Sequence, residues 1–170
     1  MTEELKIQSH TLAILVDNEA GALARVIGLF SGRGYNIESL TVAEISSEYH
    51  MSRITLVTRG TPIVVEQVKS QLGRLVPVHK VVDLTREMLG IEREMALVKV
   101  AGVGEKRVEA LRLSDGFRAR VLDTTHSSFV FEITGAPDKI DAFVDLMRPL
   151  GLVDVSRTGV VAIARGPEPM

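Results

Sequence analysis

The sequence predicts an α+β protein built from two small β-α-β-β-α-β sandwiches. Three observations favour this fold. Short aliphatic strands alternate with amphipathic helices, the same order of elements occurs twice, and the helix start Gly60-Thr61-Pro62 returns 75 positions later as Gly135-Ala136-Pro137. The chain of 170 residues has room for two domains of about 75 to 85 residues each.

The first repeat begins with a strand over residues 10–16, followed by a helix that continues to Arg33. Asp17 and Asn18 are expected to cap this helix, because their side-chain oxygens accept hydrogen bonds from free amides. Strands over 36–46 and 51–59 follow. The apolar face of the first helix consists of Leu23, Val26, Ile27 and Phe30.

A second helix of the first repeat opens with Thr61 at the N-cap and Pro62 at the first helical position, and a strand over 76–84 closes the repeat. Its apolar stripe has a counterpart in the second repeat. Val65, Val68, Leu72 and Leu75 correspond to Ile140, Phe143, Met147 and Leu150. This order of elements is that of a ferredoxin-like sandwich.

The same pattern sets the expected domain boundaries. The first domain covers residues 10–84, and the charge-rich stretch 85–94 is expected to be a linker. The second domain covers 95–165, and residues 1–9 and 166–170 are expected to be flexible termini. The strands of the second domain are expected over 95–100, 117–124, 128–134 and 152–156, and its helices over 105–113 and 137–150.

Composition argues against several classes of partner. The net charge is −2 and aromatic residues make up only 4%, whereas nucleic-acid binders need a basic face or stacking platforms. The chain has no cysteine, which excludes disulfides and thiol catalysis. The start of the chain is acidic, and no apolar run approaches the ~18 residues of a membrane span. We therefore expect a soluble, cytoplasmic protein without a nucleic-acid or membrane partner.

The sequence predicts no catalytic and no metal-ligating residue. Its four histidines lack a metal-type spacing, and Gly102-Val103-Gly104 is not continued into a dinucleotide-binding fingerprint. The Ser46-Ser47 and Ser127-Ser128 pairs lack a nucleophile elbow. A small enzyme on this fold remains an alternative, because ferredoxin-like sandwiches host many functions.

The residues around the first helix favour a site for a free amino acid. The amides of Gly21, Ala22 and Leu23 are suited to a carboxylate at the positive end of the helix, and the side-chain oxygens of Asn18 and Asn36 to an ammonium group. Ile37, with Leu40 or Val42, would wall an aliphatic side chain. A free strand edge favours a site completed by a second copy of the chain. Alternatively, Gly21 only lets the helix pack closely on the sheet.

The run from Asn18 to Ser31, followed by residues 33–42, closely resembles the small regulatory subunit of acetohydroxyacid synthase, also called acetolactate synthase. The similarity continues at Ser52-Arg53-Ile54-Thr55, at Glu92-Arg93-Glu94 and at the stretch 157–161, and it covers nearly the whole chain. The resemblance implies an amino-terminal ACT domain, a second ferredoxin-like domain, and a homodimer that activates a separate catalytic large subunit.

The resemblance also implies a ligand and a pathway. The catalytic partner would hold thiamine diphosphate, magnesium and FAD, and would act at the start of valine, leucine and isoleucine synthesis. The chain itself would carry no cofactor. L-valine would bind between paired ACT domains and inhibit the complex. The implied ligand-binding residues are Asn18, Gly21, Ala22 and Leu23, with Asn36 and Ile37 from the second chain. A free-standing ACT-type regulator of transcription is a further alternative, although no basic recognition helix is visible.

Overall fold

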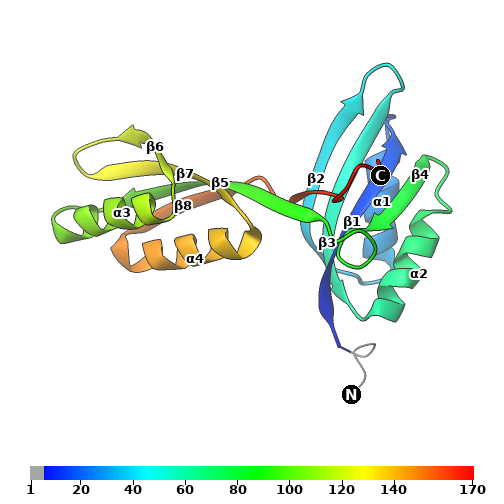
Figure 1. Ribbon diagram of the computed structural model, residues 1–170, viewed down its shortest axis with the longest axis horizontal. Helices are drawn as coiled ribbons and strands as arrows, with labels where there is room; N and C mark the ends of the chain where they lie inside the picture. The colour runs from blue at the N-terminus through cyan, green and yellow to red at the C-terminus, as the bar shows by residue number, and fades with distance from the viewer. Residues whose placement is uncertain (1–5) are drawn as a thin grey trace. The chain divides into compact units, whose positions relative to one another are not determined.

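The computed structural model describes residues 6–170, which form two compact units (Figure 1). Unit 1 contains the chain up to Ile91 together with Val160–Met170, and unit 2 contains Glu92–Gly159. Each unit contains one β-α-β-β-α-β repeat with its two helices on one face of a four-stranded antiparallel arrangement. The predicted α+β fold of two ferredoxin-like sandwiches is therefore confirmed.

Unit 1 has the strand order β2-β3-β1-β4. Its elements are β1 (Gln8–Asp17), α1 (Ala22–Gly32), β2 (Ile37–Ser46), β3 (Met51–Gly60), α2 (Pro62–Leu72) and β4 (Val78–Asp83). The first strand begins at Gln8, two residues before the expected start, and it pairs with β3 along its whole length. Of the expected flexible amino terminus, residues 1–5 lie outside the described part of the chain.

The core of unit 1 lies between its sheet and the two helices. Alternate residues of β1 and β3 face the helices, because side chains along a strand point to opposite faces in turn. The buried set is aliphatic apart from one phenylalanine, and its members are Leu12, Ile14, Val16, Val26, Phe30, Ile54, Leu56, Val65, Val68 and Leu72. The predicted apolar stripe of α2 is confirmed within this core.

A fully buried polar pair lies in the same sheet. Nδ1 of His10 on β1 is 2.8 Å from Oδ2 of Asp83 at the end of β4, and neither side chain has measurable exposure. The other carboxylate oxygen of Asp83 accepts hydrogen bonds from the amides of Thr85 and Arg86. These contacts fix the turn that follows β4.

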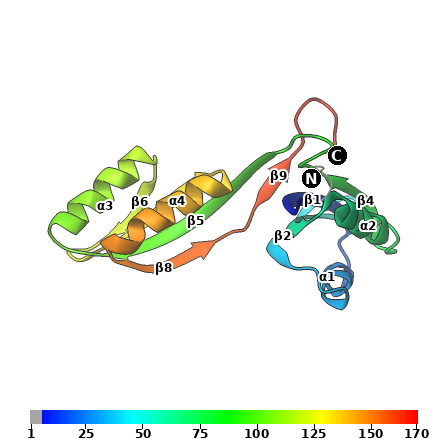
Figure 2. The same cartoon turned by 90° about the horizontal axis from the view of Figure 1, so that it is seen from below.

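The opposite face of the unit 1 sheet carries no helix formed by residues 6–170, and it is covered in part by the carboxy-terminal stretch of the chain (Figure 2). The amide of Val160 donates to Oγ of Ser39, and Oγ1 of Thr41 donates to the carbonyl of Val160, both at 2.7 Å. The expected second domain ended at residue 165. The structure instead places residues 160–165 in unit 1, because sheet residues far away in sequence bond to their backbone.

Unit 2 repeats the same order, β6-β7-β5-β8. Its elements are β5 (Ile91–Ala101), α3 (Glu105–Gly116), β6 (Arg120–Thr124), β7 (Ser128–Gly135), α4 (Pro137–Met147), a short 3-10 helix η2 (Arg148–Leu150) and β8 (Leu152–Arg157). β9 (Val161–Ile163) follows in the stretch that belongs to unit 1. The core of unit 2 contains more aromatic rings than that of unit 1, with Phe129, Phe131 and Phe143 all buried.

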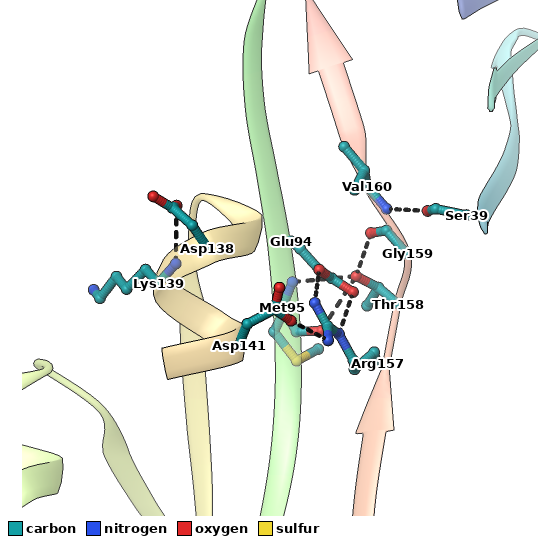
Figure 3. A network of polar contacts seen from close by, with 10 residues as sticks. All are labelled: Ser39, Glu94, Met95, Asp138, Lys139, Asp141, Arg157, Thr158, Gly159 and Val160. Atoms are coloured by element: carbon teal, nitrogen blue, oxygen red, sulfur yellow. Dashed lines mark hydrogen bonds and ion pairs between the residues drawn. The ribbon is translucent and has the colours of Figure 1, made fainter. Parts of the chain in front are cut away.

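The expected linker at 85–94 is shorter in the structure. Residues 84–87 form turns, and β5 begins at Ile91. Glu94 is 5% exposed even though its charge is typical of a linker. Arg157 at the end of β8 explains this burial: its Nε and Nη2 donate to the two carboxylate oxygens of Glu94 at 2.8 and 2.6 Å, and its Nη1 donates to Asp141 on α4 at 2.6 Å (Figure 3).

The two repeats begin their second helices in the same backbone conformation. The N-cap dihedral angles φ and ψ are −75° and 154° at Thr61 and −63° and 152° at Ala136. Oγ1 of Thr61 accepts a hydrogen bond from the amide of Val64, whereas Ala136 has no side-chain cap. The repeat therefore lacks a stabilising contact in unit 2 that it has in unit 1.

We expect Ala136→Thr to stabilise unit 2 by about 0.5–1 kcal/mol, because a threonine N-cap accepts from a helix amide that now lacks a side-chain partner. Hydrogen exchange of the β7 and α4 amides in the full chain measures the change. Ala136→Val, which has a similar shape without the hydroxyl, is the matched control. Equal stabilisation by both variants would contradict the role of the hydroxyl.

Candidate functional site

The candidate site includes the amino-terminal end of α1. The helix begins at Ala22, and its N-cap is Gly21, with φ of 88° in the left-handed region. The expected cap at Asp17 or Asn18 is therefore wrong. Asp17 is the last residue of β1, and its carboxylate lies 2.5 Å from Nε2 of His79. Glycine takes a positive φ without steric cost, which explains why the helix starts there.

The loop before α1 is held by backbone bonds to two other turns. The amide of Asp17 donates to the carbonyl of Pro77 at 2.8 Å, and the amide of Asn18 donates to the carbonyl of His50 at 2.6 Å. His50 itself has a positive φ of 47° in the turn between β2 and β3. No local pattern in the sequence indicates these long-range contacts. They fix the loop in the position from which α1 starts.

Amides at the start of α1 are free to bind a ligand. No acceptor among the described residues pairs with the amides of Gly21, Leu23 and Ala24, whereas that of Ala22 donates to the carbonyl of Glu19. A Cβ placed on Gly21 would meet no atom within 4 Å, so the space beside Gly21 at the helix start is open. Free amides and the positive end of the helix dipole together favour an anion.

The other predicted residues lie where β2 begins. Asn36 is exposed, and its carbonyl accepts a hydrogen bond from Oγ1 of Thr58 at 2.7 Å. Ile37 is half-buried and packs against the core of unit 1. The side chain of Asn36 has no partner among the described residues, so its amide group is available to a ligand or to another chain.

One copy of the chain does not bring the two groups of predicted residues together. Asn18 to Leu23 lie at the start of α1, whereas Asn36 and Ile37 follow its end. The eleven residues of α1 span about 16 Å, which exceeds the size of a small amino acid. β2 is the edge strand of its sheet, and Val42 and Ile45 on it are 43% and 56% exposed. A site containing both groups requires a second chain.

The described residues contain no cluster of three or more acidic, histidine or cysteine side chains that would hold a metal ion. Within residues 6–170, no helix is long and apolar enough to cross a membrane. The groups at the candidate site in unit 1 are backbone amides, asparagine side chains and the half-buried Ile37, and such groups are suited to binding a small zwitterion.

Comparison with known proteins covers both units. Residues 12–80 match the family model described as an AHAS small subunit-like ACT domain, and residues 93–166 match the model for the small subunit of acetolactate synthase. Unit 1 thus belongs to the class of ACT-like domains.

Known relatives align with this chain over nearly its whole length. The chain is 48% identical to a probable acetolactate synthase small subunit of Archaeoglobus fulgidus, over 92% of this chain and 97% of the relative. It is 44% identical to the acetolactate synthase isozyme 3 small subunit of Escherichia coli, over 91% and 94%. The crystal structure of the acetolactate synthase small subunit from Thermotoga maritima superposes with a TM-score of 0.82 at 36% identity, covering 95% of this chain and 99% of that one. The chain belongs to the acetolactate synthase small-subunit family.

Proposed function

We propose that this chain is the non-catalytic, regulatory subunit of a cytoplasmic acetolactate synthase that serves valine, leucine and isoleucine synthesis. It forms a homodimer through unit 1 and activates a catalytic large subunit, which holds thiamine diphosphate, magnesium and FAD. L-valine binds at the interface of the two copies of unit 1 and inhibits the complex. Family membership supports the partnership with a large subunit.

One observation carries the proposal of a valine site between two chains. The open, amide-rich start of α1 and the polar start of β2 are separated by the length of the helix within one chain, and β2 has a free edge. Pairing of two β2 edges about a two-fold axis would use the same surface on both copies. Such pairing offers a way to bring α1 of one copy close to Asn36 of the other.

The residues suit the three parts of the amino acid. The carboxylate accepts from the amides of Gly21 and Leu23, at the positive end of α1. The ammonium donates to the side-chain oxygens of Asn18 and of the second copy's Asn36. The aliphatic side chain packs on Ile37 of the second copy. Leucine and isoleucine share the first two groups, so the walls around the side chain would set the preference among the three.

Feedback through this site requires that valine bind two states of the complex with different affinity, because a ligand that binds both equally shifts nothing. A coupling free energy of about 1–3 kcal/mol corresponds to a roughly 5- to 150-fold difference in affinity. That is enough for partial inhibition of the catalytic subunit. By reciprocity, the large subunit would change the affinity for valine by the same factor.

We expect Gly21→Asp to reduce valine affinity at least 100-fold, because its carboxylate would occupy the position of the ligand carboxylate. Isothermal titration calorimetry of the full chain with L-valine measures this, with L-serine as the comparison ligand. Valine binding with the same affinity and stoichiometry in Gly21→Asp as in the unmodified chain would contradict the assigned site.

Two controls separate charge from strain in this experiment. Gly21→Asn has the size of the aspartate variant and no charge, and asparagine tolerates a positive φ. Gly28→Asp adds the same charge further along α1, at an exposed position with open space around it. We expect Gly28→Asp to bind valine normally and Gly21→Asn to bind it more tightly than Gly21→Asp does.

Activity assays with the large subunit test the regulatory role itself. The chain should raise the activity of the large subunit, valine should reverse that increase, and Gly21→Asp should keep the increase without the reversal. Turnover of pyruvate by this chain alone would instead favour the alternative of a small enzyme. Retardation of DNA by the chain in a gel-shift assay at low salt would favour the alternative of a transcription regulator.

A further inference from the structure

A cavity of about 430 Å³ lies on the helix-free face of the unit 1 sheet. Its floor is formed by Leu15, Ile45 and Arg53, on three different strands. Its other walls come from Ile163, Ala164 and the stretch Gly166–Met170. All of these residues belong to unit 1. The cavity is on the opposite face of the sheet from α1 and α2, so it does not belong to the site at Gly21.

Among the described residues that line this cavity, Arg53 is the only cation. Its Nη2 donates to the carbonyl of Ala162 at 2.7 Å, and its Nε is buried without a hydrogen-bond partner. Among the described residues, no carboxylate lies within ion-pair distance of it, whereas Arg157 has two. Burial lowers the pKa of Arg53 from its ordinary value, because the charged form loses solvation.

Arg53 has hydrogen-bond donors that no group among the described residues accepts from. A half-buried guanidinium that makes a single hydrogen bond to a carbonyl leaves most of its five donors unused. A carboxylate is the group that satisfies such donors best, because its two oxygens match two parallel N–H groups. Leu15, Ile45 and Ile163 add aliphatic surface beside this cation.

We propose that the cavity at Arg53 binds a small aliphatic carboxylate, as a second ligand site of the chain. The carboxylate pairs with the guanidinium, and the hydrocarbon part packs on Leu15, Ile45 and Ile163. The volume lies within the usual range for small-molecule sites. The ligand would also hold the carboxy-terminal stretch against the sheet, because it contacts both.

Two sources share this chemistry: simple branched acids and branched amino acids. Glu168 is the one acidic side chain among the described residues of the lining, and it would distinguish the two kinds of ligand. It would attract the ammonium of an amino acid and repel a second carboxylate. Glu168→Gln should therefore weaken binding of an amino acid and leave binding of a simple acid unchanged or stronger.

Calorimetric titration of the full-length Gly21→Asp variant tests the second site apart from the first. The probes are 3-methylbutanoate and L-valine. We expect saturable binding of at least one probe, and a loss of at least tenfold in affinity when Arg53→Gln is added. Arg59→Gln is the matched control, since Arg59 lies on the same strand and face but is exposed. Binding that is unchanged by Arg53→Gln would overturn the proposal, as would the absence of binding by both probes.

Arg53→Gln also removes the hydrogen bond to Ala162 in the carboxy-terminal stretch, so a second variant is needed that keeps this bond. Ile163→Asp keeps the bond from Arg53 to Ala162 and places a negative charge in the wall, at a side chain that is 61% exposed. It should weaken binding as well. Loss of valine binding on the change Gly21→Asp supports the regulatory site. This conclusion does not depend on the results with the Arg53 and Ile163 variants. Binding of 3-methylbutanoate that depends on Gly21, and not on Arg53, would contradict the second site alone.

Discussion

Phe143→Ala is expected to lower the free energy of unfolding of unit 2 by about 3–5 kcal/mol. Phe143 on α4 has no exposed surface. Its ring centroid lies 5.4 Å from that of Phe117 and 6.0 Å from that of Phe131, the latter in an edge-to-face arrangement. Alanine would remove apolar burial and both ring contacts and leave a cavity that neighbouring side chains fill only in part.

Native-state hydrogen exchange on the full chain measures this loss, because it reports the two units separately. The β5 and β7 amides should exchange about 100-fold faster or more, while those of β1 and β3 in unit 1 should keep their rates. Phe143→Leu, which retains most of the volume, should cost less than about 1.5 kcal/mol. An equal loss from the leucine and alanine variants would show that cavity size does not determine the effect.

Arg157→Ala is expected to destabilise unit 2 by about 2–3 kcal/mol. The variant leaves the carboxylate of Glu94 buried without its two hydrogen bonds from the guanidinium (Figure 3). Removing one partner of a fully buried pair costs about 3–5 kcal/mol. We expect less here, because Arg157 is 36% exposed and water can reach part of the site.

The matched control is Arg148→Ala. Arg148 pairs with Asp145 within the same unit, but both side chains are largely exposed, so this change should cost less than about 1 kcal/mol. Exchange of the β5 and β8 amides next to Glu94 and Arg157 measures both variants. Arg157→Ala combined with Glu94→Leu should recover stability, because the combined variant leaves no buried charge at this position. Failure of that rescue would contradict the explanation.

Local patterns in the sequence predicted most of the fold. The start of α2 follows from Thr61 and Pro62, whose cap and helix-start preferences are local, and the structure confirms it. The beginning of β5 and the course of residues 160–165 were missed, because they depend on distant partners. Glu94 is buried by an arginine 63 positions away, and Val160 is held by Ser39 across 121 positions. Such pairings leave no local pattern.

The candidate site was predicted in part for the same reason. The sequence indicates that Gly21 leaves the helix start open, and the structure shows open space beside this residue. Its role as the N-cap was missed in favour of Asp17 and Asn18, because their usual capping preference was outweighed by bonds to Pro77 and His50. The residues next to Arg53 in sequence do not indicate that its side chain is a half-buried cation without an ion-pair partner among the described residues.

Unit 1 is formed from two separate stretches of chain, with all of unit 2 inserted between them. During synthesis, residues 160–170 leave the ribosome only after the whole of unit 2. Until then the apolar side chains that pack with Ala162, namely Ala13, Val82 and Leu84, lack part of their cover. A nascent chain that stops inside unit 2 would keep this patch open to solvent, and exposed apolar surface of this kind promotes aggregation. The cover of this patch on unit 1 therefore depends on residues that are synthesised after unit 2.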